Sequence, residues 1–161
     1  RKRIIDNKFL IRLTNYLEDM NESGLLSTIN YFIIEEQVKK ADNNRIIQFH
    51  IRSYLLMLFL SFKPIICFSA THKTKVLGAP KKLWNEKKQQ IIKMDKSARK
   101  KWASDKCLAI LSERNDMEGL AQIFAKQGRK KVKSDDYADC LLHILSWSYL
   151  VFVDGQSQYQ S

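Results

Sequence analysis

The chain has 161 residues, enough for one domain that buries a sizeable core. Hydrophobic residues make up 45% of it and it has only 5 Gly and 2 Pro, so a disordered protein is excluded. The formal net charge of +11 favours a polyanionic partner, either nucleic acid or an acidic membrane surface.

Two elements are predicted in the first part of the chain. Apolar residues at helical spacing indicate a first helix, followed by Gly24: Phe9, Leu10, Leu13, Tyr16 and Leu17. Residues 30–34 are β-branched and aromatic and too few for a helix, so they predict a buried strand. The strand leads into Glu35 and Glu36, and because side chains alternate along a strand, only one of these carboxylates can join a given site.

A long helix and a second strand come next. The helix is predicted to begin near Asp42 or Asn43 and to run through the apolar stretch 53–62 until Pro64 ends it. Its second half is apolar all round, so we expect it to be buried against a sheet. The stretch is too short to span a membrane. Residues 63–69 predict the next buried strand, parallel to the first because a long helix joins them.

Three further helices are predicted in the second half of the chain. Residues 97–112 indicate one, and Asn115 or Asp116 could cap the next. Ser134 is the expected N-cap of the last, which runs to Leu150. The order of helix, strand, helix, strand and further helices predicts an α/β fold.

The cysteines indicate the redox environment. Cys67, Cys107 and Cys140 are widely spaced and form no Cys-x-x-Cys pair. Because their number is odd, we expect reduced thiols in an intracellular compartment rather than a disulfide framework or a zinc site.

The positive charge is confined to one segment. Residues 73–133 hold 18 Lys and Arg against 6 Asp and Glu, a net charge of +12, while the rest of the chain holds 10 against 11. Such a run is usually a solvated face, but its lysines are spread over the whole segment, which favours nucleic acid over a membrane. The candidate phosphate contacts are Lys81, Lys82, Lys87, Lys88, Arg99, Lys100, Lys101, Arg129, Lys130 and Lys131. Trp84 and Trp102 could stack on bases, although aromatic residues at helical spacing more often belong to a core.

Carboxylates occupy the first turns of the last predicted helix. Asp136 and Asp139 are three residues apart and so point the same way. Two carboxylates held that close repel each other unless a divalent cation neutralises them, and their oxygen atoms suit Mg²⁺ or Mn²⁺. The alternative is that first-turn acids complement the helix dipole, which is the role expected of Asp135.

The two acidic motifs, in this order, resemble those of a known family. Ile34-Glu35-Glu36-Gln37, a long apolar helix, a second strand, a lysine-rich stretch and a final Asp-Asp-x-Ala-Asp helix at 135–139 are similar to the RuvC-type Holliday-junction resolvases. The nearest branch is that of poxviruses, other large DNA viruses and fungal mitochondria, and the resemblance covers residues 30–150. It implies a ribonuclease H-like α/β fold with a mixed sheet flanked by helices. Residues 1–154 would form one nuclease domain and 155–161 a polar tail.

The resemblance also implies the chemistry. Glu35, Asp136 and Asp139 would bind two Mg²⁺ ions, or Mn²⁺, about 4 Å apart, assisted by Lys73 or, less favoured, Lys75. One ion would activate water and the other would stabilise the leaving 3′ oxygen. The implied substrate is a four-way junction in branched DNA, cut by a homodimer without a small-molecule cofactor or a membrane. The implied location is intracellular: a viral replication compartment, a virion or a mitochondrion.

The chain departs from this family at one point. The family's first strand carries a further metal-binding aspartate in an Asp-x-Gly sequence, and no Asp-x-Gly precedes Glu35. Asp6 is too near Glu35 in sequence for the strands and helix that the family has between them. We therefore expect that the first strands are missing or that this copy has lost its activity. The alternative function is a non-catalytic nucleic-acid-binding or virion structural protein with the same fold, and a ribonuclease H acting on hybrids would differ only in substrate.

If the basic residues of 73–133 bind phosphates, affinity for branched DNA falls steeply as salt is added. Replacing Lys100 and Lys101 by Glu is expected to weaken binding to every sequence about equally, because phosphate contacts carry no base code. Titrations of labelled junctions of two sequences at several salt concentrations measure both effects. Salt-independent binding, or full affinity in the double variant, would mean that the segment is a solvated face.

Overall fold

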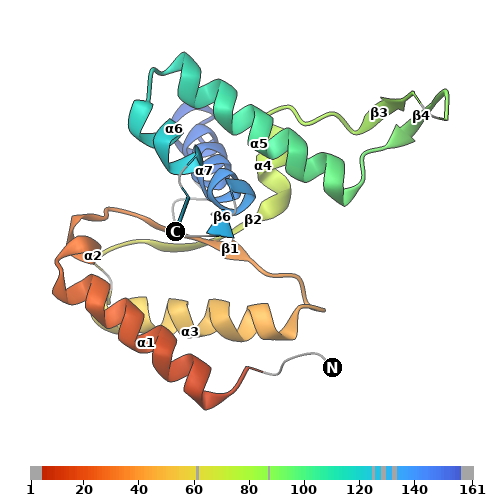
Figure 1. Ribbon diagram of the computed structural model, residues 1–161. Helices are drawn as coiled ribbons and strands as arrows, with labels where there is room; N and C mark the ends of the chain where they lie inside the picture. The colour runs from red at the N-terminus through yellow and green to blue at the C-terminus, as the bar shows by residue number, and fades with distance from the viewer. Residues whose placement is uncertain are drawn as a thin grey trace. The chain divides into compact units, whose positions relative to one another are not determined.

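The computed structural model describes residues 5–60, 62–86, 88–124, 126–127, 130–131 and 134–156. Within these residues the fold is mixed α/β, mostly helical with small sheets, which confirms the predicted class (Figure 1). The chain divides into two compact units. Unit 1 comprises the described residues up to Ala70 and those from Asp154 onward, and unit 2 comprises Thr71–Val153.

Unit 1 contains a parallel two-stranded sheet whose strands are joined by a long helix. In chain order its elements are α1 (Asn7–Glu22), α2 (Leu25–Thr28), β1 (Phe32–Glu36), α3 (Asp42–Phe59) and β2 (Ile65–Ser69). β1 and β2 run parallel, with Phe32 opposite Ile65 and Glu36 opposite Ser69. The predicted first helix, both strands, their parallel pairing and the helix between them are confirmed.

Local side-chain and backbone chemistry sets the ends of α1. Asp6 is its N-cap, and the Asp6 carboxylate accepts a hydrogen bond from the Phe9 amide at 2.8 Å. Gly24, between α1 and α2, has a φ angle of +78°, a left-handed conformation that glycine adopts without strain. Asp6 therefore has a structural role at the start of a helix, as expected if it is not the family's strand-borne metal ligand.

Two polar side-chain contacts join α1 to α3. Thr14 Oγ1 lies 2.8 Å from His50 Nε2. The Tyr54 hydroxyl donates to the Glu18 carboxylate. Burial, aided by this bond and the charge of Glu18, raises the pKa of Tyr54 to about 12, so the phenol keeps its proton at neutral pH. These contacts fix the two helices against each other beside the sheet.

Lys63, which follows α3, joins the end of α2 to the end of α3 in unit 1. Lys63 Nζ donates to the carbonyl oxygens of Leu26, Ser27 and Ile29 at 3.1, 2.5 and 2.7 Å. These carbonyls lie at the C-terminal end of α2, where a cation also complements the helix dipole. Lys63 Nζ lies 4.7 Å from the centre of the Phe59 ring as well. One ammonium group thus holds α2 and the end of α3 next to β2.

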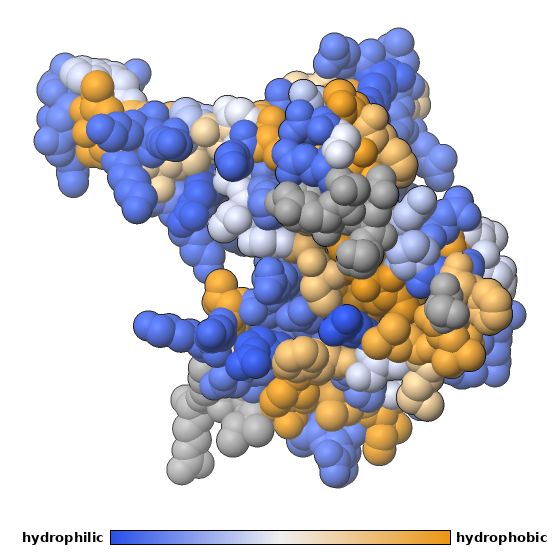
Figure 2. Space-filling model, turned by 180° about the vertical axis from the view of Figure 1, so that it is seen from behind, coloured by the Kyte–Doolittle hydropathy of each residue, from blue (hydrophilic) through white to orange (hydrophobic). Residues whose placement is uncertain are grey.

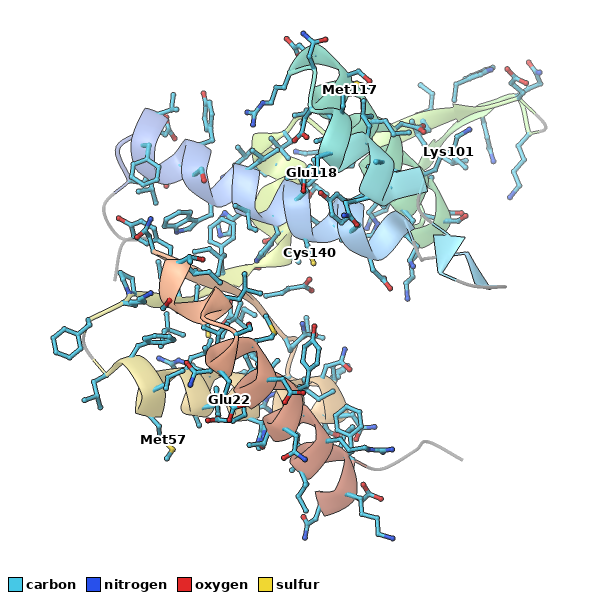
Figure 3. The ribbon with its side chains drawn as sticks, turned by 60° about the vertical axis from the view of Figure 1, so that its left-hand side comes forward. Glu22, Met57, Lys101, Met117, Glu118 and Cys140 are labelled. Carbon is cyan, nitrogen blue, oxygen red and sulfur yellow. The ribbon has the colours of Figure 1, made fainter. Side chains whose placement is uncertain are left out.

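The second half of α3 is not buried all round, so that prediction was wrong. Leu55 is 3% exposed, but Met57 is 80% exposed and points away from the neighbouring elements of unit 1 (Figure 3). Leu56 and Leu58 are exposed too, because α1 and the two-stranded sheet cover only one side of α3. No helix among the described residues is long and apolar enough to cross a membrane.

Unit 2 consists of helices and two short antiparallel hairpins. Its elements are α4 (Ala70–Val76, which begins on the last residue of unit 1), β3 (Lys82–Asn85), β4 (Gln90–Lys93), α5 (Lys96–Glu113), α6 (Met117–Phe124), β5 (Lys126–Gln127), β6 (Lys130–Lys131), α7 (Ser134–Ser148) and the π-helix η1 (Tyr149–Val153). α5, α6 and α7 confirm the three predicted helices. Asp116 rather than Asn115 caps α6, since its carboxylate accepts from the Gly119 amide at 2.8 Å.

The β3–β4 hairpin and α4 have no counterpart among the predicted elements. Each strand of the hairpin has four residues, too few for alternation to stand out, and lysines flank both. α4 has seven residues and follows β2 without a break, so no turn signal separates them.

Helices α5, α6 and α7 pack around one core. Its buried residues are Ala103, Cys107, Leu111, Ile123, Ala138 and Leu142. A Cβ atom on Gly119 would lie 2.7 Å from Leu111 Cδ2, so the glycine allows α6 to approach α5 closely. None of the three cysteines, all of which lie within the described residues, is part of a disulfide, and burial raises the pKa of the Cys107 thiol.

Replacing Lys63 by Met is expected to lower the free energy of unfolding by about 1.5–3 kcal/mol, the usual range for hydrogen bonds to a charged group. Methionine keeps the aliphatic stem but leaves the three carbonyl oxygens without their donor. Urea unfolding followed by circular dichroism measures the change. Lys40→Met, at an exposed position before α3, is the control and is expected to be neutral. Equal stability of the two variants would contradict this role of Lys63.

Candidate functional site

The register of α7 determines which of its side chains are accessible. Ala138 and Leu142 are fully buried, and Tyr137 packs against the same core. Burial, followed by the charge of Asp116, raises the pKa of Tyr137, so this phenol also stays protonated. Asp136 is exposed and the Asp139 side chain is 39% exposed. Burial of the residues between them therefore turns both carboxylates away from the core of unit 2.

An ion pair joins α7 to α4. Lys73 Nζ lies 2.9 Å from Asp139 Oδ1. The Lys73 side chain is only 11% exposed, so its ammonium group has little access to water. Lys75, the other lysine considered from the sequence, is exposed. The lysine that follows the second strand and the last aspartate of the acidic motif thus form an ion pair in unit 2.

The chemistry of the two carboxylates fits a hard divalent cation. Asp136 and Asp139 offer oxygen atoms one helical turn apart, which Mg²⁺ and Mn²⁺ prefer. Lys73 already neutralises part of this charge and so reduces the repulsion between the carboxylates. The part of the chain that the structure describes contains no group of three or more His, Cys, Asp or Glu arranged to hold a metal ion. Unit 2 therefore supplies two candidate ligands.

Glu35 lies at the end of β1 in unit 1, within a network of amide side chains. Glu35 is exposed and lines a cavity of about 240 Å³ together with Gln37, Asn44 and Gln48. Gln48 Oε1 accepts a hydrogen bond from the backbone N–H of Gln37 at 2.9 Å, and Gln48 Nε2 donates to Cys67 Sγ at 3.3 Å. The network ties the end of β1 to α3 and to β2. The convergence of Glu35 with Asp136 and Asp139 stays a prediction.

Two other residues of α7 follow the acidic pair closely in sequence. His143, one turn beyond Asp139, is 4% exposed, which suits a structural role. Cys140 follows Asp139 directly and is exposed (Figure 3). A cysteine thiol is a softer ligand than a carboxylate, so Cys140 does not add to a site for Mg²⁺.

The basic candidates whose side chains the structure describes are on the surface. Lys81, Lys82, Lys88, Arg99, Lys100 and Lys101 are exposed, on or beside the β3–β4 hairpin and along the first half of α5. Lys87 and Arg129 lie outside the described residues, and Lys130 and Lys131 form the backbone of β6. Exposure of this kind suits contact with phosphate groups, although it also suits a solvated face.

The two tryptophans considered for base contact differ. Trp102 is half-buried and packs against the core of unit 2, whereas Trp84, on β3, is 58% exposed. Trp102 also lines a cavity of about 440 Å³ between the hairpin and α5, with Leu83, Met94 and Lys101. Sequence reasoning missed this surface. The signal for it was the pair of matching segments Lys-Leu-Trp and Ile-Ile-Lys on either side of a short turn.

Comparison with known proteins shows a similarity to a viral protein. The chain is 30% identical to "Uncharacterized protein 170L" of Invertebrate iridescent virus 6, over 74% of this chain and 51% of that protein. The chain therefore spans about half the length of this relative. No family model matches the chain, and no solved structure matches it.

The Lys73–Asp139 pair predicts an asymmetry between two variants. Asp139→Asn leaves a nearly buried ammonium without its carboxylate and is expected to cost about 1–3 kcal/mol of unfolding free energy. Lys73→Met leaves a carboxylate that water can reach, so it is expected to cost less. The variant with both changes should be close in stability to Lys73→Met, because the isolated charge is gone. Urea unfolding of the four proteins measures this, and a larger loss for Lys73→Met would contradict the account.

Proposed function

We propose that the chain is the nuclease portion of a Mg²⁺-dependent endonuclease that cuts branched DNA, with a ribonuclease H-like fold. The observation that carries the proposal is the 2.9 Å contact between Lys73 and Asp139. The resemblance to the junction resolvases selects these two residues from motifs that are 66 positions apart in the sequence. Their contact supports a shared site at the start of α7.

The arrangement of secondary structure is a second support. A parallel pair of strands joined by a long helix, followed by a lysine-rich segment and an acidic helix, has the order that the resemblance requires. Glu35, the last residue but one of this first strand, is exposed and available as a ligand. Exposed lysines before and along α5 would hold the phosphate backbone and bring it to the carboxylates.

Each residue then has a defined role in the proposed site. Asp136, Asp139 and Glu35 would hold the metal ions, and Mg²⁺ when bound would supply charge neutralisation and an activated water. Lys73 positions Asp139, because its ammonium fixes one oxygen of that carboxylate. The same ammonium lowers the negative charge that an approaching phosphate meets. A homodimer would offer one such site to each of two crossing strands, and the viral relative favours a viral replication compartment.

The second candidate is a non-catalytic nucleic-acid-binding or virion structural protein. Two observations favour it. The described residues contain no group of three or more potential metal ligands, and Asp139 already has Lys73 as its counter-ion. In this alternative the acidic pair would only complement the helix dipole at the start of α7, and the basic surface would still bind nucleic acid.

Asp136→Asn in the complete protein is expected to abolish Mg²⁺-dependent cleavage of a four-way junction while junction binding is kept or tightened. Binding can tighten because the change removes a negative charge that faces phosphate. Asp136 is exposed, so the fold should not suffer, whereas Asp139→Asn combines loss of cleavage with the loss of stability predicted above. Gel assays of cleavage and binding on the same labelled junction measure both effects.

Asp135→Asn is the matched control, since Asp135 directly precedes Asp136 in the same helix and successive residues of an α-helix are about 100° apart. It is expected to cost about 0.3–1 kcal/mol of stability through the helix dipole and to leave cleavage nearly unchanged. If the wild-type protein binds junctions but never cleaves them with Mg²⁺, the non-catalytic candidate is correct. If Asp136→Asn and Asp139→Asn both cleave normally, the metal site lies elsewhere.

A further inference from the structure

The β3–β4 hairpin has one face that combines an aromatic ring with lysines. Trp84 on β3 lies directly opposite Ile91 on β4, and Lys82 lies opposite Lys93. Because side chains alternate along a strand, these four residues share one face of the hairpin. The face thus carries an apolar pair with two ammonium groups next to it.

This face is exposed to solvent, whereas the other face is partly buried. Trp84 is 58% exposed and Ile91 is 65% exposed, and both lysines are exposed. On the opposite face Leu83 and Ile92 are half-buried, and together with Trp84 and Lys93 they line an open cavity of about 310 Å³ beside the start of α5. In Figure 2 the hairpin, at the upper left, shows hydrophobic residues between hydrophilic ones. The inner face therefore attaches the hairpin to unit 2, and the outer face presents Trp84.

The charge around this face favours a polyanion. Residues 81–101 hold 9 Lys and Arg against 2 Asp and Glu, a net charge of +7. Lys101, on α5, lines the cavity beneath the hairpin and extends the positive surface from the strands to the helix (Figure 3). A ligand that contacts both Trp84 and the lysines must combine a flat apolar group with closely spaced negative charges. An unpaired stretch of nucleic acid has this combination.

We infer that the outer face of the β3–β4 hairpin binds unpaired nucleotides, with a base stacked on Trp84 and the adjoining phosphates held by Lys82 and Lys93. This inference rests on the proposed function and assigns the hairpin to the unpaired bases of a branched substrate. Ile91 supports the edge of the stacked base from the neighbouring strand. Binding here is insensitive to base sequence, because every base offers a flat face and every phosphate a charge.

Tryptophan fluorescence of the complete protein tests the inference with a thymidine oligonucleotide as probe. Trp102 is half-buried and Trp147 is 3% exposed, so Trp84 is the tryptophan that a base can reach. The oligonucleotide is expected to quench the wild-type signal. Trp84→Phe keeps a ring for stacking and should bind within about threefold of wild type, but without that quenching. Trp84→Ala should bind about 5- to 150-fold more weakly, the range for loss of one stacked base.

Two further variants make the test specific. Tyr149→Ala removes an exposed aromatic ring of unit 2 away from the hairpin and should leave binding and quenching unchanged. Lys82→Glu combined with Lys93→Glu should weaken binding and reduce the slope of log affinity against log salt by about 1.4, as expected for two phosphate contacts on a single strand. Full affinity in both Trp84→Ala and the double variant would overturn the inference.

The outcomes separate this inference from the proposed nuclease function. If the nuclease proposal fails, no variant or metal produces cleavage, yet the oligonucleotide still quenches Trp84. If the hairpin inference fails, junctions are cleaved and Trp84→Ala behaves as wild type in binding. The inference would be overturned if the oligonucleotide bound without changing the Trp84 fluorescence, or did not bind at all. A protein partner would then be the alternative ligand of the hairpin face.

Discussion

The packing of α7 against α5 is the constraint on which the candidate site depends. Ala138 and Leu142 are fully buried and meet Cys107 and Leu111 in one core. Once these residues face inward, helical geometry leaves Asp136 and Asp139 on the outer side. A shift of α7 by one residue would bury a carboxylate and expose apolar side chains, at a cost far above that of any surface interaction. The apolar core of unit 2 thus orients its acidic residues.

The ion pair between Lys73 and Asp139 follows from this orientation. Lys73 reaches Asp139 from α4, which lies in the same unit as α7. A nearly buried ammonium requires a carboxylate, and Asp139 meets that need while Asp136 stays exposed. The two aspartates of one motif therefore have different surroundings. Because of this difference, a substitution of Asp136 is expected to affect metal binding alone, whereas a substitution of Asp139 also affects the stability of the fold.

Much of the fold could be predicted, and the failures have physical causes. Helices α1, α3, α5, α6 and α7 and the parallel pair β1–β2 follow from apolar spacing, Pro64 and acidic or hydroxyl caps. The sides of α3 that are buried could not be predicted. Apolar residues all round a helix do not indicate which of its sides other elements cover. Met57 shows the result.

Less of the site than of the fold follows from sequence. The acidic motif and the favoured lysine could be chosen in advance, but their contact depends on the tertiary path through α4. The hairpin that presents Trp84 was missed, because its sequence signal is confined to two four-residue strands. Local periodicity is weak in elements so short, and tertiary contacts decide their structure.

The proposed function requires that Glu35 and the two aspartates of α7 bind the same metal ions. Manganese is a paramagnetic substitute for Mg²⁺ at carboxylate ligands, so NMR spectra of the isotope-labelled protein test this directly. We expect substoichiometric Mn²⁺ to broaden the amide signals of Glu35 together with those of Asp136 and Asp139, and Asp136→Asn to weaken the broadening at all three. Broadening confined to α7, or spread evenly over all exposed carboxylates, would contradict a shared site.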